Sequence, residues 1–272
     1  MTTTRHSRWA HWVAGALAFL VIGAYGLLTP PGLLTKMDWI GAAVCHRIPS
    51  HSFVLAGRPL PLCARCTGTF LGALTALLGQ AMILRRRGAN FPPPVIMAFL
   101  LGFILLMGVD GVNSYVDLVR GTPLFYQPRN ELRLITGALN GLALGALLWP
   151  MVNFSLWRHP RPERTIRDGL DFGILFLMEA GVVALVLVEG SSLLYPLALA
   201  SALGVLMMLT LPMTILVVIL AGWENRYDQW REAKMPLLMG LALAFLLIGL
   251  MDLFRYAITG TITGFPGLEG TP

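Results

Sequence analysis

The stretch LRLITGALNGLALGALLWPMVNF, residues 132–154, carries a single charged side chain. A helix needs roughly 20 mostly apolar residues to cross the hydrocarbon core of a bilayer, so this stretch is long enough to span a membrane. Further runs of the same kind lie at about 9–28, 66–84, 92–112, 170–189, 195–221 and 236–257. The pattern predicts an all-α integral membrane protein, a bundle of about seven transmembrane helices.

The composition leads to the same fold class. Of the 272 residues, 56% are hydrophobic and only 12% are charged, whereas a typical soluble domain is about 25% charged. These values exclude a soluble enzyme and a disordered chain. The segments between the apolar runs are short, so we expect no separate soluble domain.

Basic residues in the loops predict the orientation of the bundle. With a cytoplasmic N-terminus, 12 of the 20 Lys and Arg residues lie inside and 8 lie outside or at the outer interface. We therefore expect a multi-pass protein of the cell membrane with an extracytoplasmic C-terminus, whose first apolar run is a retained helix rather than a signal peptide. The net charge of +6 then reflects topology and anionic lipid. Because no nucleic-acid-binding motif is present, the expected partner is the bilayer and not nucleic acid.

Breaks in the pattern divide the chain into three parts. Residues 29–32, Thr-Pro-Pro-Gly, end the first helix, and a short interfacial helix is expected over 33–44. A second long outer loop is expected over 110–131, and a basic loop at 157–168 separates the first four spans from the last three. The predicted parts are an N-terminal helix with its interfacial segment, a central module of spans 2–4, and three C-terminal helices, with boundaries at 1–39, 40–154 and 155–272.

All three cysteines lie close together in the first outer loop, which suggests a metal site. Cys45, His46, Cys63 and Cys66 supply three thiolates and an imidazole, ligands that suit zinc or iron. His51 is an alternative fourth ligand. If only three protein ligands bind, one position stays open for water or substrate.

Two other interpretations of the cysteines remain open. The pair Cys63-x-x-Cys66 begins a predicted helix, and a helix N-terminus lowers the pKa of a thiol; Arg65 between the two adds to that effect. Such a pair can cycle between dithiol and disulfide, with Cys45 resolving a mixed disulfide. The cysteines could instead be buried as small hydrophobic residues.

Charged side chains at the same depth as this loop suggest one polar cavity in the outer leaflet. Asp110 lies near the outer end of the third span and Arg133 opens the fourth. Charges in a membrane are costly and often mark function. We expect Asp110 to orient a ligand or act as a base, and Arg65 and Arg133 to bind an anionic group such as a phosphate or carboxylate.

Three more ionisable residues lie in the C-terminal spans. Asp252 and Arg255 are one helical turn apart and can form a local pair, or extend to the interface as helix-end charges often do. Glu179 lies in the middle of the fifth span. It is expected to be either protonated or partnered inside the bundle.

Small residues recur at every fourth position in two of the predicted spans. Gly68 and Gly72 do so in the second span, and Gly137, Gly141 and Gly145 do so in the fourth. Because this spacing lets helix backbones approach closely, spans 2 and 4 are expected to pack together.

The motifs of residues 40–148 resemble those of one family of small prokaryotic membrane proteins of unknown function. Its signature reads Cys-His, then Cys-Ala-Arg-Cys-x-Gly, followed by Asp-Gly, Asn-x-x-Arg and Thr-Gly. Here the matching positions are Cys45-His46-Arg47, Cys63-Ala64-Arg65-Cys66-Thr67-Gly68, Asp110-Gly111, Asn130-x-x-Arg133 and Thr136-Gly137. The family often has Arg in place of His51, which makes His51 the poorer ligand. The resemblance implies that Arg47 and Asn130 belong to the site as ligand-binding residues, and it implies no reaction.

Three functions fit these residues. The first is a membrane metalloenzyme acting on an anionic or lipid-like substrate at the outer face. The second is a membrane thiol-disulfide redox protein that uses Cys63 and Cys66. The third is a transporter or assembly subunit in which the metal is structural. The sequence leaves open whether the protein is an enzyme.

Overall fold

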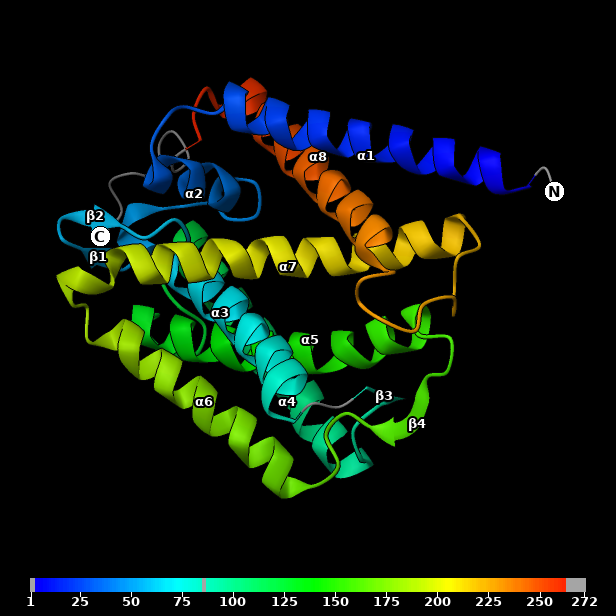
Figure 1. The fold of residues 1–272 in the computed structure, drawn as a ribbon. Helices are drawn as coiled ribbons and strands as arrows, with labels where there is room; N and C mark the ends of the chain where they lie inside the picture. The colour runs from blue at the N-terminus through cyan, green and yellow to red at the C-terminus, as the bar shows by residue number, and fades with distance from the viewer. Residues whose placement is uncertain (1–2, 85–86, 263–272) are drawn as a thin grey trace.

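The protein is an α-helical bundle with a few short strands in its loops, as a computed structural model shows (Figure 1). The structure describes residues 3–84 and 87–262. Its elements are α1 (Thr3–Leu28), α2 (Leu33–Ala42), η1 (Pro49–His51), β1 (Val54–Leu55), β2 (Arg58–Pro59), α3 (Ala64–Leu78), η2 (Gly79–Ile83), β3 (Gly88–Asn90), α4 (Pro94–Arg120), α5 (Asn130–Leu156), β4 (Arg161–Arg164), α6 (Gly169–Leu187), η3 (Ser191–Leu193), α7 (Leu194–Leu220) and α8 (Lys234–Thr259). Strands β1 and β2 pair antiparallel, and β3 and β4 pair parallel.

In the described part of the chain, six helices are long and apolar enough to cross a membrane, and a bent pair makes up to seven spans. The bent pair joins residues 14–28 to α2 at an angle of 110°. The break at residues 29–32 is confirmed, because α1 ends at Leu28 and Gly32 adopts a φ of 110°. The short helix expected after it is present as α2, and its position at the membrane interface stays a prediction. The structure thus confirms an all-α membrane bundle of about seven spans.

Helices α3 and α5 pack backbone to backbone at the centre of the bundle. A Cβ atom at Gly68 would overlap the carbonyl oxygen of Leu134, and one at Gly141 would overlap that of Thr69. Glycine at these positions is therefore what allows the helices to approach so closely. The predicted packing of spans 2 and 4 is confirmed.

The later helices surround this pair. Helix α7 crosses α3, where Gly204 lies against the backbone of Phe70, and α8 packs on α7 through Gly240 (Figure 1). Helix α1 packs on α8. Helix α6 contacts both α3 and α5. The chain reverses direction between successive spanning helices, so their ends form two opposite polar faces.

Helix α4 extends further than the sequence suggests. The expected loop over 110–131 is wrong for its first part, since α4 runs on to Arg120 and ends at Gly121, which has a φ of 70°. The polar residues that suggested a loop belong instead to the inward face of the helix, where Asp110, Asn113 and Ser114 are buried. Asn113 accepts hydrogen bonds from the backbone N–H groups of Leu124 and Phe125, at 3.0 and 2.8 Å, and thereby fixes the loop that follows.

Candidate functional site

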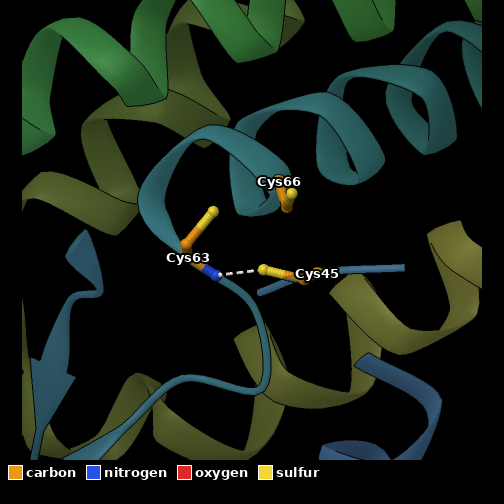
Figure 2. A group of neighbouring side chains, drawn as sticks. All are labelled: Cys45, Cys63 and Cys66. Carbon is orange, nitrogen blue, oxygen red and sulfur yellow. Dashed lines mark hydrogen bonds between the residues drawn. The ribbon is translucent and has the colours of Figure 1, made fainter. Parts of the chain in front are cut away.

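The three cysteines lie together (Figure 2), at the end of the bundle where α3 begins (Figure 1). Cys45 follows α2 in the chain, Cys63 is the N-cap residue of α3, and Cys66 lies in the first turn of that helix. Their sulfur atoms lie within 4.8 Å of one another, and all three are free thiols. Cys45 and Cys63 are buried and Cys66 is half-buried. Tight packing of α3 against α5 fixes the helix end that carries two of them.

Backbone N–H groups point at the sulfur atom of Cys45. The N–H of Cys63 donates to it at 3.2 Å, as Figure 2 shows, and the N–H of Arg47 donates at 3.4 Å. Arg47 adopts a left-handed φ of 52°, which turns the chain back toward the sulfur. Such donors stabilise the anionic form of a thiol.

Hydrogen bonding within the cluster favours the thiolate form of one cysteine, Cys45. Hydrogen bonds from the Cys63 and Cys66 thiols, with the backbone N–H of Cys63, hold the pKa of Cys45 well below that of a free thiol. The hydrogen bond with Cys45 in turn raises the pKa of Cys63 to about 12. The cluster thus favours a thiolate at Cys45 and resists a second one beside it.

This donor set fits a soft metal ion. Thiolates at the usual zinc–sulfur distance of about 2.3 Å in tetrahedral geometry lie about 3.8 Å apart, so the three sulfur atoms are close to the spacing that a metal needs. Without a metal, the thiolate at Cys45 opposes deprotonation of the other two thiols. The positive charge of a bound cation offsets this repulsion, so that all three thiols can coordinate it as thiolates. Cys45, Cys63 and Cys66 are therefore the candidate ligands.

The structure does not group His46 with the three sulfur atoms. Its Nδ1 accepts a hydrogen bond from the N–H of Ile48 at 3.1 Å, and its ring meets that of His51 edge to face at 5.6 Å between centroids. Burial lowers the pKa of His46, and burial with the nearby Arg133 lowers that of His51 to about 4. Both rings are neutral at pH 7. That His46 completes the ligand set stays a prediction.

Arg65 and Asp110 form a buried ion pair beside the cluster. The Nε and Nη2 atoms of Arg65 donate to Asp110 Oδ2 at 3.0 and 2.5 Å, and Nη2 also donates to Ser114 at 2.9 Å. Asp110 is 1% exposed and accepts two more bonds, from the hydroxyls of Tyr126 at 2.7 Å and Thr136 at 3.3 Å. The carboxylate is thus saturated by donors from three different segments.

Arg133 and Asn130 hold the loop that carries the histidines. Arg133 Nη1 donates to Asn130 Oδ1 at 2.9 Å, and its Nη2 lies 3.4 Å from Nε2 of His51. Asn130 in turn donates to the carbonyl of Ser50 at 3.1 Å. Arg133 is buried, and its Nε has no partner in the described part of the chain.

Arg47 is turned toward α2. Its guanidinium donates to the carbonyl and the carboxylate of Asp38, the latter at 2.7 Å, and Arg58 reaches the other carboxylate oxygen at 2.5 Å. Burial lowers the pKa of Arg47, while Asp38 opposes that shift. The candidate role of Arg47 in ligand binding stays a prediction, and the contact visible here is structural.

Arg255 of α8 supports the cysteine loop from outside the central module. It donates to the carbonyl oxygens of Ala42, Cys45 and His46 at 2.9, 2.5 and 2.8 Å. Asp252, one turn earlier, accepts a long hydrogen bond of 3.5 Å from Tyr25 of α1. Deeper in the bundle, Glu179 is 2% exposed, and neither carboxyl oxygen has a hydrogen-bond partner among the described residues.

Two cavities adjoin the cluster, and His46 lines both. The first, of about 290 Å³, lies between the cysteine loop and α8 and is lined by Cys45 and Arg255 among others. The second, of about 330 Å³, lies between the histidine loop and α4. The residues that line the second cavity are His46, Ile48, His51, Arg65, Gly111, Ser114, Tyr115 and Leu118. The lining of this second cavity therefore combines the large side chains of Tyr115 and Leu118 with a guanidinium and two imidazoles.

Sequence reasoning missed several partners at this site. Tyr126 and Ser114 complete the Asp110–Arg65 pair, and Asp38 neutralises Arg47. Asp38 is the sole acidic residue between residues 1 and 109, and several arginines follow it in the next loop. This imbalance of charge is a signal in the sequence that Asp38 should form an ion pair with one of those arginines. Nothing in the sequence marks Tyr126.

The fold and the site define a polytopic α-helical membrane protein with a three-cysteine cluster at one end of its bundle. Residues 45–147 match the family described as Predicted membrane protein (DUF2085). An uncharacterised protein of Methanothermobacter thermautotrophicus is 32% identical over 104 residues, which cover 38% of this chain and 83% of that one. The chain therefore belongs to the DUF2085 family, as the resemblance of its motifs implied.

A second relative matches the same part of the chain. It is an uncharacterised protein of Methanocaldococcus jannaschii, 28% identical over 108 residues, which cover 40% of this chain and 63% of that protein. No solved structure matches the chain. The later helices α6–α8 lie outside the family match.

Proposed function

We propose that Cys45, Cys63 and Cys66 bind a transition-metal ion, zinc or iron, and that the protein acts at this centre on an anionic or lipid-like molecule. The observation that carries the proposal is the approach of the three sulfur atoms to within 4.8 Å. With three protein ligands, a tetrahedral ion keeps one position for water or a ligand. When bound, the ion supplies a Lewis acid.

The cavity beside α4 is the proposed ligand site. Arg65 lines it, and its Nη1 has no hydrogen-bond partner in the described ranges, so this donor is available to an anionic group. The large side chains of Tyr115 and Leu118 suit a lipid-like substituent. His46 and His51 are neutral and can donate or accept a hydrogen bond from such a ligand.

Asp110 acts in this proposal as a positioning residue. Its carboxylate already accepts from Arg65, Tyr126 and Thr136, which leaves it poorly placed to take a proton from a ligand. It holds the guanidinium of Arg65 at the edge of the cavity. Arg133 contributes charge and holds His51 in place.

We further propose that the cysteine end of the bundle faces outward, with a cytoplasmic N-terminus and an extracytoplasmic C-terminus. Four of the eight arginines and lysines at that end, Arg47, Arg65, Arg133 and Arg255, are engaged in contacts within the site rather than facing solvent. The basic loops at the opposite end are largely exposed. The difference in free positive charge supports the orientation that the residue count favours.

Metal analysis of the purified protein tests the proposed centre. We expect about one zinc or iron per chain, lost on Cys63→Ser and retained on Ser191→Ala, an exposed site in the loop before α7. Acidification should release the metal, since protons compete for the thiolates. A metal-free protein whose three thiols all react after denaturation would contradict the proposal.

The redox function is the second candidate, because the cluster favours a thiolate at Cys45 beside two further thiols. It predicts no metal and one titratable thiol of three in the oxidised, denatured protein. A reductant should restore the other two. Thiol counting before and after reduction therefore separates the two functions in one preparation.

A further inference from the structure

A second polar cavity lies at the opposite end of the bundle from the cysteines. It has a volume of about 190 Å³ and is lined by Arg87, Trp157, His159, Arg161, Tyr227 and Asp228. These residues come from the loops that join α3 to α4, α5 to α6 and α7 to α8. Apart from Arg87, the lining residues lie outside the family match at 45–147, and none of them lines either of the cavities beside the cysteines.

Backbone and side-chain contacts between the three loops build this cavity. The N–H of Arg158 donates to the carbonyl of Tyr227 at 2.9 Å, and the N–H of Tyr227 donates to that of Leu156 at 3.2 Å. Asn153 links Trp157 to the first loop by accepting from the indole N–H at 2.8 Å and donating to Gly88 at 2.9 Å. The walls are therefore fixed by the fold rather than by the flexible ends of side chains.

The lining has an excess of positive charge. Asp228 is its one acid, and that carboxylate is paired with Arg158 at 2.8 Å. Arg87 lies with its guanidinium carbon 4.7 Å from the ring centre of Trp157 and donates to the carbonyl of Asp228 at 3.2 Å. The guanidinium of Arg161 has no hydrogen-bond or ion-pair partner in the described chain, so two guanidinium groups and one imidazole line the cavity without a free anion to match them.

We propose that this cavity binds a phosphate group, carried by a phospholipid headgroup or free in solution. Guanidinium groups match phosphate oxygens in paired hydrogen bonds. The volume lies below the range of about 300–1,000 Å³ for drug-sized ligands, which fits a single phosphate and its immediate substituent. Trp157 directly follows α5, and Tyr227 lies in the loop between α7 and α8; both are of the residue types enriched at the headgroup level of a bilayer.

The test compares Arg161→Gln with Arg164→Gln in the full-length protein. Both arginines are exposed on β4, but only Arg161 lines the cavity. Retention of phosphatidylglycerol is measured by native mass spectrometry. Binding of inorganic phosphate to lipid-free protein in detergent is measured by calorimetry. Far-ultraviolet circular dichroism checks that each variant is folded.

We expect Arg161→Gln to weaken binding about tenfold or more, as loss of one charge-assisted hydrogen bond implies, and Arg164→Gln to leave it near wild type. Retention of phosphatidylglycerol alone identifies a lipid headgroup as the source, and binding of inorganic phosphate alone identifies the free ion. Equal losses in both variants would show only general attraction to a basic surface and overturn the proposal. So would binding of neither probe by the wild type.

Discussion

At the scale of single residues, the site depends on one ion pair whose carboxylate is almost completely buried. Arg65 and Asp110 are 17% and 1% exposed in their side chains, whereas Arg158 and Asp228, at the other end of the bundle, are 53% and 44% exposed. Both pairs have short contacts, of 2.5 and 2.8 Å. Burial, not distance, should decide how much each pair matters, because water screens the second pair and not the first.

Asp110→Asn should destabilise the protein by about 3 kcal/mol, since it leaves the Arg65 charge buried without its anion. Asp228→Asn is the matched control and should cost less than about 1 kcal/mol. Unfolding in detergent, followed by circular dichroism against temperature, measures the difference. Equal shifts in melting temperature for the two variants would contradict the interpretation of Asp110 as an anchor.

The sequence singled out the ion pair's members but not their other partners. Arg65 and Asp110 are charged residues at the same predicted depth in the membrane, and this can be read from the sequence alone. Tyr126 and Ser114 are ordinary residues whose importance arises only from the fold, because they approach Asp110 and Arg65 across a helix and a loop. The hydrogen-bond partner of a hydroxyl group cannot be predicted from the sequence, because it depends on where the folded backbone places that side chain.

At the scale of elements, the α3–α5 contact positions the cysteines. Five glycines of the two helices lie directly against the backbone of the partner helix, so the start of α3, with Cys63 and Cys66, is packed closely against α5. Because almost no side chain lies between the two backbones at this contact, any atom added there must push the helices apart. The cysteine cluster should therefore respond to changes made two turns away from it.

Gly141→Ala should destabilise the protein by about 2 kcal/mol or more, because the new Cβ would overlap the carbonyl of Thr69. The control is Gly108→Ala in α4, where a Cβ meets no described atom within 4 Å. That change should be neutral or stabilising by up to about 1 kcal/mol, given the higher helix propensity of alanine. Thermal unfolding of both variants in the same detergent is the measurement. A larger loss for Gly108→Ala would contradict the packing argument.

The periodic patterns predicted the elements well where they were apolar and less well where they became polar. The spans and the small-residue stripes were recognisable because lipid and close packing impose them. The end of α4 was misplaced because Asp110, Asn113 and Asp117 look like loop residues, although they repeat at helical spacing. A polar face inside a bundle cannot be distinguished from a polar loop by composition alone.

At the scale of the whole molecule, the two polar ends of the bundle should lie on opposite sides of the membrane. Ser191, before α7, is at the cysteine end, and Gln229, before α8, is at the other; both are exposed. In intact cells, Ser191→Cys should react with a membrane-impermeant maleimide, and Gln229→Cys should react only after permeabilisation. The unsubstituted protein, whose own cysteines are buried or half-buried, is the control. The reverse pattern of labelling would refute the proposed orientation.

The hydrogen bonds from Arg255 of α8 to the loop that carries Cys45 invite a comparison with the smaller relatives. The match accounts for 83% of the Methanothermobacter protein, so the remainder of that chain is too short for counterparts of α6–α8. In the present chain the donor belongs to α8. A helix outside the family match therefore holds the loop that carries one of the three cysteines. The shape of that loop is set jointly by the part of the chain that the family match covers and by the part that it leaves out.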